Sequence, residues 1–122
     1  MKDNILYKKA EKFALRIIRF CNILKEKKKE FIISNQLFRS GTSIGANIAE
    51  SLYAASKLDF ANKLQIALKE ASESEYWINL LYSAEYVNKI EYDSLIKDLK
   101  EIIRILTSSI NTSKGNCNQD YI

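Results

Sequence analysis

Three carboxylates have residue types and spacing that could support acid–base or metal chemistry. Glu70 and Glu73 lie three residues apart, on one face of any helix that contains them, and Glu50 could join them from an earlier segment. Carboxylate metal centres in helical bundles normally add histidines from Glu-x-x-His motifs, and this chain contains no histidine. We therefore favour a structural ion-pair network over a metal or catalytic site. The candidate members of that network are Arg39, Asn47, Glu50, Glu70 and Glu73.

Hydroxyl side chains between Ser40 and Ser43 could act as nucleophiles only beside a general base. Histidine is absent from the chain, and no lysine lies in that stretch. The sequence also lacks a Cys/His metal cluster and a nucleotide-binding signature. We therefore predict a protein that is not an enzyme, with no catalytic residue, no metal and no cofactor.

Basic residues could bind phosphate groups, and they are concentrated near the start of the chain. Up to Arg39 there are eleven basic and four acidic residues, a difference of +7, whereas the remainder has eight basic and eleven acidic residues, a difference of −3. Such separation suits a polyanion or a partner subunit with the complementary charge. The alternative is a solvated surface that serves solubility. The candidate nucleic-acid-binding residues are Lys8, Lys9, Lys12, Arg16, Arg19, Lys27, Lys28 and Lys29.

A stretch of small residues, RSGTSIGANIAE from Arg39 to Glu50, lies between two strongly apolar segments. Gly41, Gly45 and Ala49 are spaced four residues apart, so on a helix they form one smooth face that a neighbouring backbone can approach closely. A glycine-rich phosphate loop is the alternative, but it requires a preceding strand and a following Gly-Lys-Ser/Thr. We favour helix packing, and we expect this face to contact the small residues between positions 67 and 74.

Four segments repeat apolar residues at helical spacing, and the chain contains no proline. The repeat is most regular in the third segment, where the steps alternate between four and three residues. The residues that form this row are Phe60, Leu64, Ala67, Ala71, Ser74, Ile78 and Leu81.

The breaks between these repeats place the helix boundaries. We expect helices from about Asp3 or Asn4, from Phe31 to about Tyr53, after a cap at Ser56, and from about Tyr92, with the first turn inside residues 25–30. Short connections make consecutive helices antiparallel, so the predicted fold class is all-α, an antiparallel up-down four-helix bundle. The bundle domain should span residues 1–112, and the polar residues 113–122 should form a disordered tail.

Several of these motifs together resemble one known family. RSGTSIGANIAE, Phe60, the string IALKEA from Ile66 to Ala71 and the pair Tyr76–Trp77 resemble, in order and spacing, the four-helix-bundle family encoded in intervening sequences of bacterial 23S rRNA genes. The resemblance extends from about Phe13 to about Ile110. It implies an up-down four-helix bundle that assembles into a ring, a homopentamer, and accessory proteins of diversity-generating retroelements look like relatives. The family has no established catalytic residues, so the resemblance implies none here.

Location and partners follow from what the sequence contains and lacks. No apolar run is long enough to span a membrane, and the N-terminus lacks the apolar region of a signal peptide, so we expect a cytoplasmic protein with no membrane contact. Cys21 and Cys117 should then be reduced thiols, although a disulfide between them is an alternative. The apolar surface of the first helix, including Ile18 and Phe20, exceeds what one bundle seam needs, so we expect some of it to be buried between subunits of a homo-oligomer. The function we favour is an oligomer associated with RNA or DNA; a structural or protein-binding scaffold is the alternative.

Overall fold

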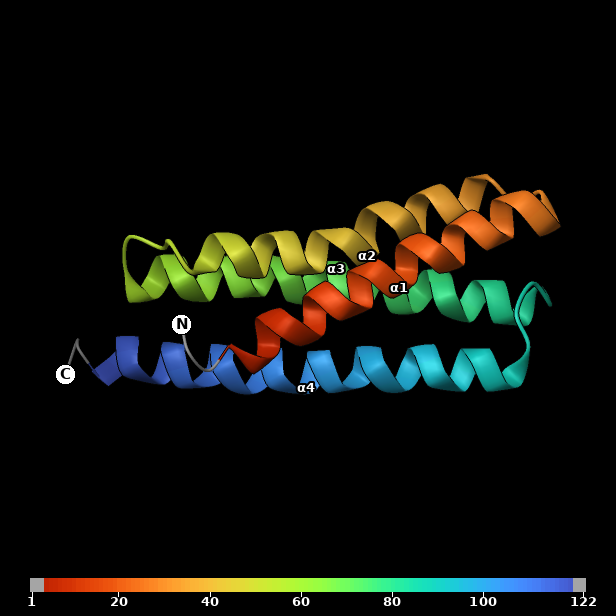
Figure 1. The fold of residues 1–122 in the computed structure, drawn as a ribbon. Helices are drawn as coiled ribbons and strands as arrows, with labels where there is room; N and C mark the ends of the chain where they lie inside the picture. Colours follow the sequence, from red (N-terminus) through yellow and green to blue (C-terminus); the bar gives the residue numbers. More distant parts are fainter. Residues whose placement is uncertain (1–3, 120–122) are drawn as a thin grey trace.

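A computed structural model describes the backbone of residues 4–119 and the side chains of residues 4–114. Four α-helices follow one another along the chain: α1 (Ile5–Lys28), α2 (Ile32–Ser51), α3 (Lys57–Ser83) and α4 (Lys89–Gln119). Consecutive helices run in opposite directions, and the described residues contain no strand (Figure 1). The predicted fold class, an all-α antiparallel up-down four-helix bundle, is confirmed.

The polar side chain just before the helix caps the start of α1, α3 and α4, because the first turn of a helix has amides without intrahelical partners. The Asn4 side chain accepts a hydrogen bond of 2.8 Å from the Tyr7 amide at the start of α1. The predicted cap at Ser56 is confirmed, since its hydroxyl accepts a 3.0 Å hydrogen bond from the Asp59 amide. At α4 the Asn88 side chain accepts from the Glu91 amide, so this helix begins a few residues earlier than expected.

The first turn is shorter than the expected break over residues 25–30. Helix α1 continues to Lys28, because lysine and glutamate are good helix formers and lysines near a helix C-terminus complement its dipole. The helix ends at Lys29, whose φ of 56° places its backbone in the left-handed region. Only residues 29–31 therefore connect α1 to α2.

The regular row in α3 forms the centre of the core. Its residues from Leu64 to Leu81 are all buried, together with apolar residues of the other three helices. Helix α3 packs extensively against both α2 and α4, whereas α1 packs mainly against α2 and only sparsely against α4. Figure 1 shows why: α1 crosses the bundle at an angle, close to α4 at its start and beside α2 at its end.

The small face of α2 contacts a different helix from the one expected. A Cβ atom added to Gly41 would lie 2.9 Å from Ile17 Cγ2, and one added to Gly45 would lie 3.6 Å from the Ala10 carbonyl oxygen. Both neighbours belong to α1, so our expectation that this face packs against α3 is wrong. Another row of α2 makes the close α3 contact, where the buried Ser40 and Ser74 hydroxyls are 2.8 Å apart.

Helix α4 extends into the residues that we expect to form the tail. Helix α4 continues through residues 113–119, because the polar residues there are compatible with a helix and no proline interrupts it. Residues 120–122 of the expected tail lie outside the described residues, as does the side chain of Cys117. Cys21 is a buried free cysteine. None of the described helices is long and apolar enough to cross a membrane.

Candidate nucleic-acid interface

The connection between α1 and α2 concentrates positive charge at one end of the bundle. Lys27, Lys28 and Lys29 are all exposed there, and none forms an ion pair with a described residue. We call residues 27–31 the lysine turn. In Figure 1 it is the orange bend between α1 and α2, at the end opposite the start of α1 and close to the α3–α4 connection.

Glu30, the acidic residue within the lysine turn, points into the protein. Its side chain is 8% exposed, and its carboxylate accepts hydrogen bonds from the Ile33 amide at 3.1 Å, the Ser34 amide at 2.7 Å and the Ser34 hydroxyl at 3.0 Å. Burial by itself would raise the pKa of Glu30, but these hydrogen bonds outweigh it and hold the pKa below its ordinary value. The carboxylate stays charged, and it caps α2.

This arrangement determines the charge that the lysine turn presents to solvent. Because the Glu30 carboxylate is occupied by amides of α2, it forms no ion pair with the three lysines that precede it. In the sequence, a glutamate follows the three lysines directly, and its charge could partly neutralise theirs. The structure separates the two charges: cations on the surface and the anion inside.

The candidate cations of α1 divide into two groups. Lys9 pairs with Glu101 of α4 at 2.7 Å, and Arg16 pairs with Glu91 at 3.0 Å and Asp98 at 2.9 Å. These residues join α1 to α4 where apolar contact between the two helices is sparse, so their charges are already compensated. Three other candidates, which precede the lysine turn on this helix, are exposed and have no ion-pair partner among the described residues: Lys8, Lys12 and Arg19.

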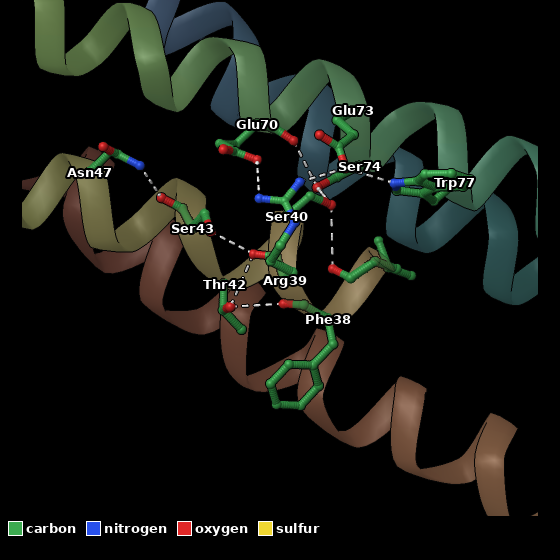
Figure 2. A network of polar contacts seen from close by, with 11 residues as sticks. Phe38, Arg39, Ser40, Thr42, Ser43, Asn47, Glu70, Glu73, Ser74 and Trp77 are labelled. Atoms are coloured by element: carbon green, nitrogen blue, oxygen red, sulfur yellow. Dashed lines mark hydrogen bonds and ion pairs between the residues drawn. The ribbon is translucent and has the colours of Figure 1, made fainter. Parts of the chain in front are cut away.

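The predicted polar network is only partly assembled. Arg39 donates to Glu70 at 3.3 Å and to Glu73 at 2.6 Å, linking α2 to α3 (Figure 2). Trp77, which we did not predict, also donates to Glu73 at 3.0 Å; this bond and the one from Arg39 hold the pKa of Glu73 below its ordinary value. Both carboxylates are therefore committed to structural contacts.

The other two residues of that network lie elsewhere. Glu50 pairs with Lys63 of α3 at 3.0 Å, and Asn47 donates to the Ser43 carbonyl of its own helix. Within the described part of the chain, no group of three or more acidic, cysteine or histidine residues could hold a metal ion. The three glutamates thus form two separate ion-pair groups.

Hydroxyl groups of α2 are likewise engaged. Thr42 donates to the Phe38 carbonyl at 2.7 Å and Ser43 to the Arg39 carbonyl at 2.6 Å, as serine and threonine do in helix interiors (Figure 2). Ser40 contacts the Ser74 hydroxyl. None of these three hydroxyls hydrogen-bonds to a basic side chain among the described residues, so the geometry supplies no activated nucleophile.

A cleft of about 760 Å³ borders the lysine turn, between the end of α1 and the α3–α4 connection. Its lining combines Lys28 and Lys89 with Glu85 and Glu91, so it has no single charge. Phe20 also lines it and is 7% exposed, which leaves that ring little surface for a subunit contact, contrary to our expectation. The mixed lining makes the cleft a poorer phosphate site than the lysine turn.

Known proteins resemble the chain in both sequence and fold. The model of a family described as 23S rRNA-intervening sequence protein matches residues 2–108. A crystal structure of a protein with unknown function from the S23 ribosomal protein family of Bacteroides thetaiotaomicron VPI-5482 is 50% identical, with a TM-score of 0.88 over 91% of this chain and 99% of that one. No curated protein matches. Since the family model covers most of its length, the chain belongs to the 23S rRNA-intervening sequence protein family.

Proposed function

We propose that the protein is a cytoplasmic, non-enzymatic homo-oligomer that binds nucleic acid through the lysine turn and the free cations of α1. One observation carries this proposal: three consecutive exposed lysines have no ion-pair partner among the described residues, and the carboxylate of the adjacent Glu30 is bonded inside the protein. Lysines contact phosphates irrespective of base sequence and release counterions from the strand. Binding should therefore tolerate different sequences and weaken steeply with salt.

Oligomerisation would strengthen such a surface. Each chain carries a formal charge of +4, so five copies would carry +20 and repeat the lysine turn around an axis. Repetition raises the effective concentration of binding sites along one strand. The pentameric ring is part of this proposal, and light scattering of the purified protein tests it: the mass of a single chain would refute the ring.

A triple substitution tests the nucleic-acid interface. Lys27, Lys28 and Lys29 are replaced together by Gln, and binding of labelled RNA and DNA is followed by fluorescence anisotropy across a salt series. Affinity should fall, and the log–log salt slope should flatten by roughly 2 to 3 if each lysine contacts one phosphate. The mass and the thermal melt should be unchanged.

A matched control removes the same charge elsewhere. Lys69, Lys97 and Lys114 are exposed lysines of α3 and α4, away from the lysine turn. A variant with all three replaced by Gln should bind nucleic acid nearly as tightly as the wild type and show nearly the same salt slope. Equal losses in the two triple variants would mean that net charge, and not the lysine turn, attracts the strand.

The competing function is a protein-binding or purely structural scaffold. It is favoured by apolar side chains exposed near the same end of the bundle, above all Ile90 at 84% and Ile32 at 79%. A protein that ignores both RNA and DNA at micromolar concentration and low salt would establish this alternative and refute our proposal.

A further inference from the structure

The lysine turn also exposes an aromatic ring. Phe31 follows the lysines directly and is 51% exposed, whereas Ile33, two residues later, packs against the core. In the sequence, Phe31 indicates only the start of a helix. The signal that could have identified it is an aromatic residue immediately after a basic run at a helix boundary.

The ring of Phe31 has no aromatic or cationic partner among the described residues, and half of its side chain is exposed. Phe38 differs, since the Lys25 ammonium lies 5.5 Å from its ring centroid. A large aromatic side chain left half in water forgoes the stabilisation that burial would give. Its exposure beside three cations suggests a ligand with both an aromatic face and negative charge.

We propose that the lysine turn binds single-stranded nucleic acid, with phosphates on Lys27–Lys29 and one unpaired base stacked on Phe31. Phe31 lies two residues from Lys29, so their Cα atoms are at most about 8 Å apart, since consecutive Cα atoms are separated by ~3.8 Å. One strand can therefore contact the lysines and the ring together. Inside a duplex each base already stacks on its neighbours, so only an unpaired base offers its face to a protruding ring.

The backbone of the turn supports this assignment. Lys29 adopts the left-handed conformation that glycine occupies at lower energy, with a φ of 56°. A lysine held there keeps a third cation next to Phe31 at some cost in stability. The inward direction of Glu30 removes the anion next to Phe31 from the path of a strand.

This inference rests on the proposed function, and comparing ligands separates the two. Anisotropy at a fixed low salt concentration is measured for an unstructured single strand of about 16 nucleotides, within the site sizes of single-strand-binding folds, for the corresponding duplex, and for a strand of equal length without bases. The intact single strand should bind most tightly. The baseless strand keeps the phosphates, so it should retain the salt dependence but lose the stacking contribution.

Substitutions at Phe31 identify the stacking ring. Phe31→Ala should weaken binding of the intact strand by about 5- to 150-fold, the equivalent of one stacked base, and leave binding of the baseless strand and the salt slope unchanged. Phe31→Trp should restore affinity because it keeps an aromatic face. Ile32→Ala, at the neighbouring and even more exposed position, is the matched control and should have little effect.

Three results would overturn the inference. If duplex and single strand bind equally and Phe31→Ala changes neither, the turn binds phosphates alone, and the proposed function stands without stacking. If Phe31→Ala changes the mass of the assembly, the ring belongs to a contact between copies. If no nucleic acid binds the wild-type protein, the proposed function fails, and the inference fails with it.

Discussion

The two glycines of α2 should respond in opposite ways to the same substitution. Both lie inside α2, and neither has a positive φ, so alanine can adopt the backbone conformation at either position. Replacing a helical glycine by alanine stabilises a helix by about 1 kcal/mol when the added methyl group fits. The outcome at each position therefore depends on what the new Cβ meets on α1.

At Gly45 the methyl group fits. Its nearest neighbours, the carbonyl oxygen, carbonyl carbon and Cβ of Ala10, would lie at 3.6 to 3.7 Å, an ordinary van der Waals distance. Gly45→Ala should therefore gain most of the roughly 1 kcal/mol of helix propensity. Gly45→Leu is the contrasting variant: its larger side chain would press on the α1 backbone and cost roughly 1 to 3 kcal/mol.

At Gly41 the methyl group collides with a side chain that has little freedom. It would lie 2.9 Å from Ile17 Cγ2 and 3.1 Å from Cγ1. Ile17 is fully buried, and a β-branched residue in a helix strongly prefers one χ1 rotamer, so it cannot turn away without disturbing the core. Overpacking of this kind costs roughly 1 to 3 kcal/mol, which cancels or exceeds the gain in propensity.

The difference between Gly41→Ala and Gly45→Ala should thus be roughly 1 to 3 kcal/mol in the free energy of unfolding, with Gly45→Ala the more stable. Urea melts of the two variants and the wild type, monitored by circular dichroism with a common m-value, measure it directly. In a double variant, Gly41→Ala with Ile17→Ala, both colliding γ carbons are absent, so its loss of stability should be smaller than the sum of the losses of the two single variants. If Gly41→Ala is as stabilising as Gly45→Ala, the close approach of α1 to Gly41 is refuted.

Three further predictions follow from the lysine turn and the core. Glu30→Gln should lower the free energy of unfolding by roughly 1 to 2 kcal/mol, as for other lost helix caps. Because the folded-state pKa of Glu30 lies below its ordinary 4.5, the difference in stability between wild type and variant should be full above pH 4.5 and should shrink as the pH falls further. Urea melts from pH 3 to 7 measure this difference, and a constant value would contradict the charged cap. Lys29→Gly should raise the free energy of unfolding by about 1 kcal/mol, because glycine adopts the left-handed backbone without strain. It should also flatten the log–log salt slope of nucleic-acid binding by about 0.7 to 0.9, the contribution of one phosphate contact. A urea melt without stabilisation would show that Lys29 is not strained. Burial raises the pKa of the Cys21 thiol to about 12, so in a Cys117→Ser background iodoacetamide at pH 8 should label the protein only after urea unfolds it; rapid labelling of the native protein would contradict the buried site.

The sequence alone determined the number and order of the helices and the buried row of α3. The row from Phe60 to Leu81 identified the buried side of α3. An α-helix has about 3.6 residues per turn, so the residues that contact the core must recur at that period. Local chemistry also placed the Ser56 cap, since a serine side chain reaches an amide only three residues away. The lysine run was visible as a candidate surface for the same reason: it is a local feature of composition.

The tertiary structure decided which side chains meet. Periodicity marks the small face of α2 as buried but does not name its partner, and any neighbouring backbone can fit against glycine; the tilt of α1 brings Ala10 and Ile17 there. The pairing of Arg16 with Glu91 and Asp98 joins residues more than seventy positions apart, so its charge appears free in the sequence and is compensated in the fold. Lys29 and Glu30 are adjacent in the chain, yet the lysine points outward and the glutamate inward. The start of α2 offers free amides to the Glu30 carboxylate, whereas the Lys29 ammonium, which pairs with no described residue, has only water or a ligand as partner at the surface.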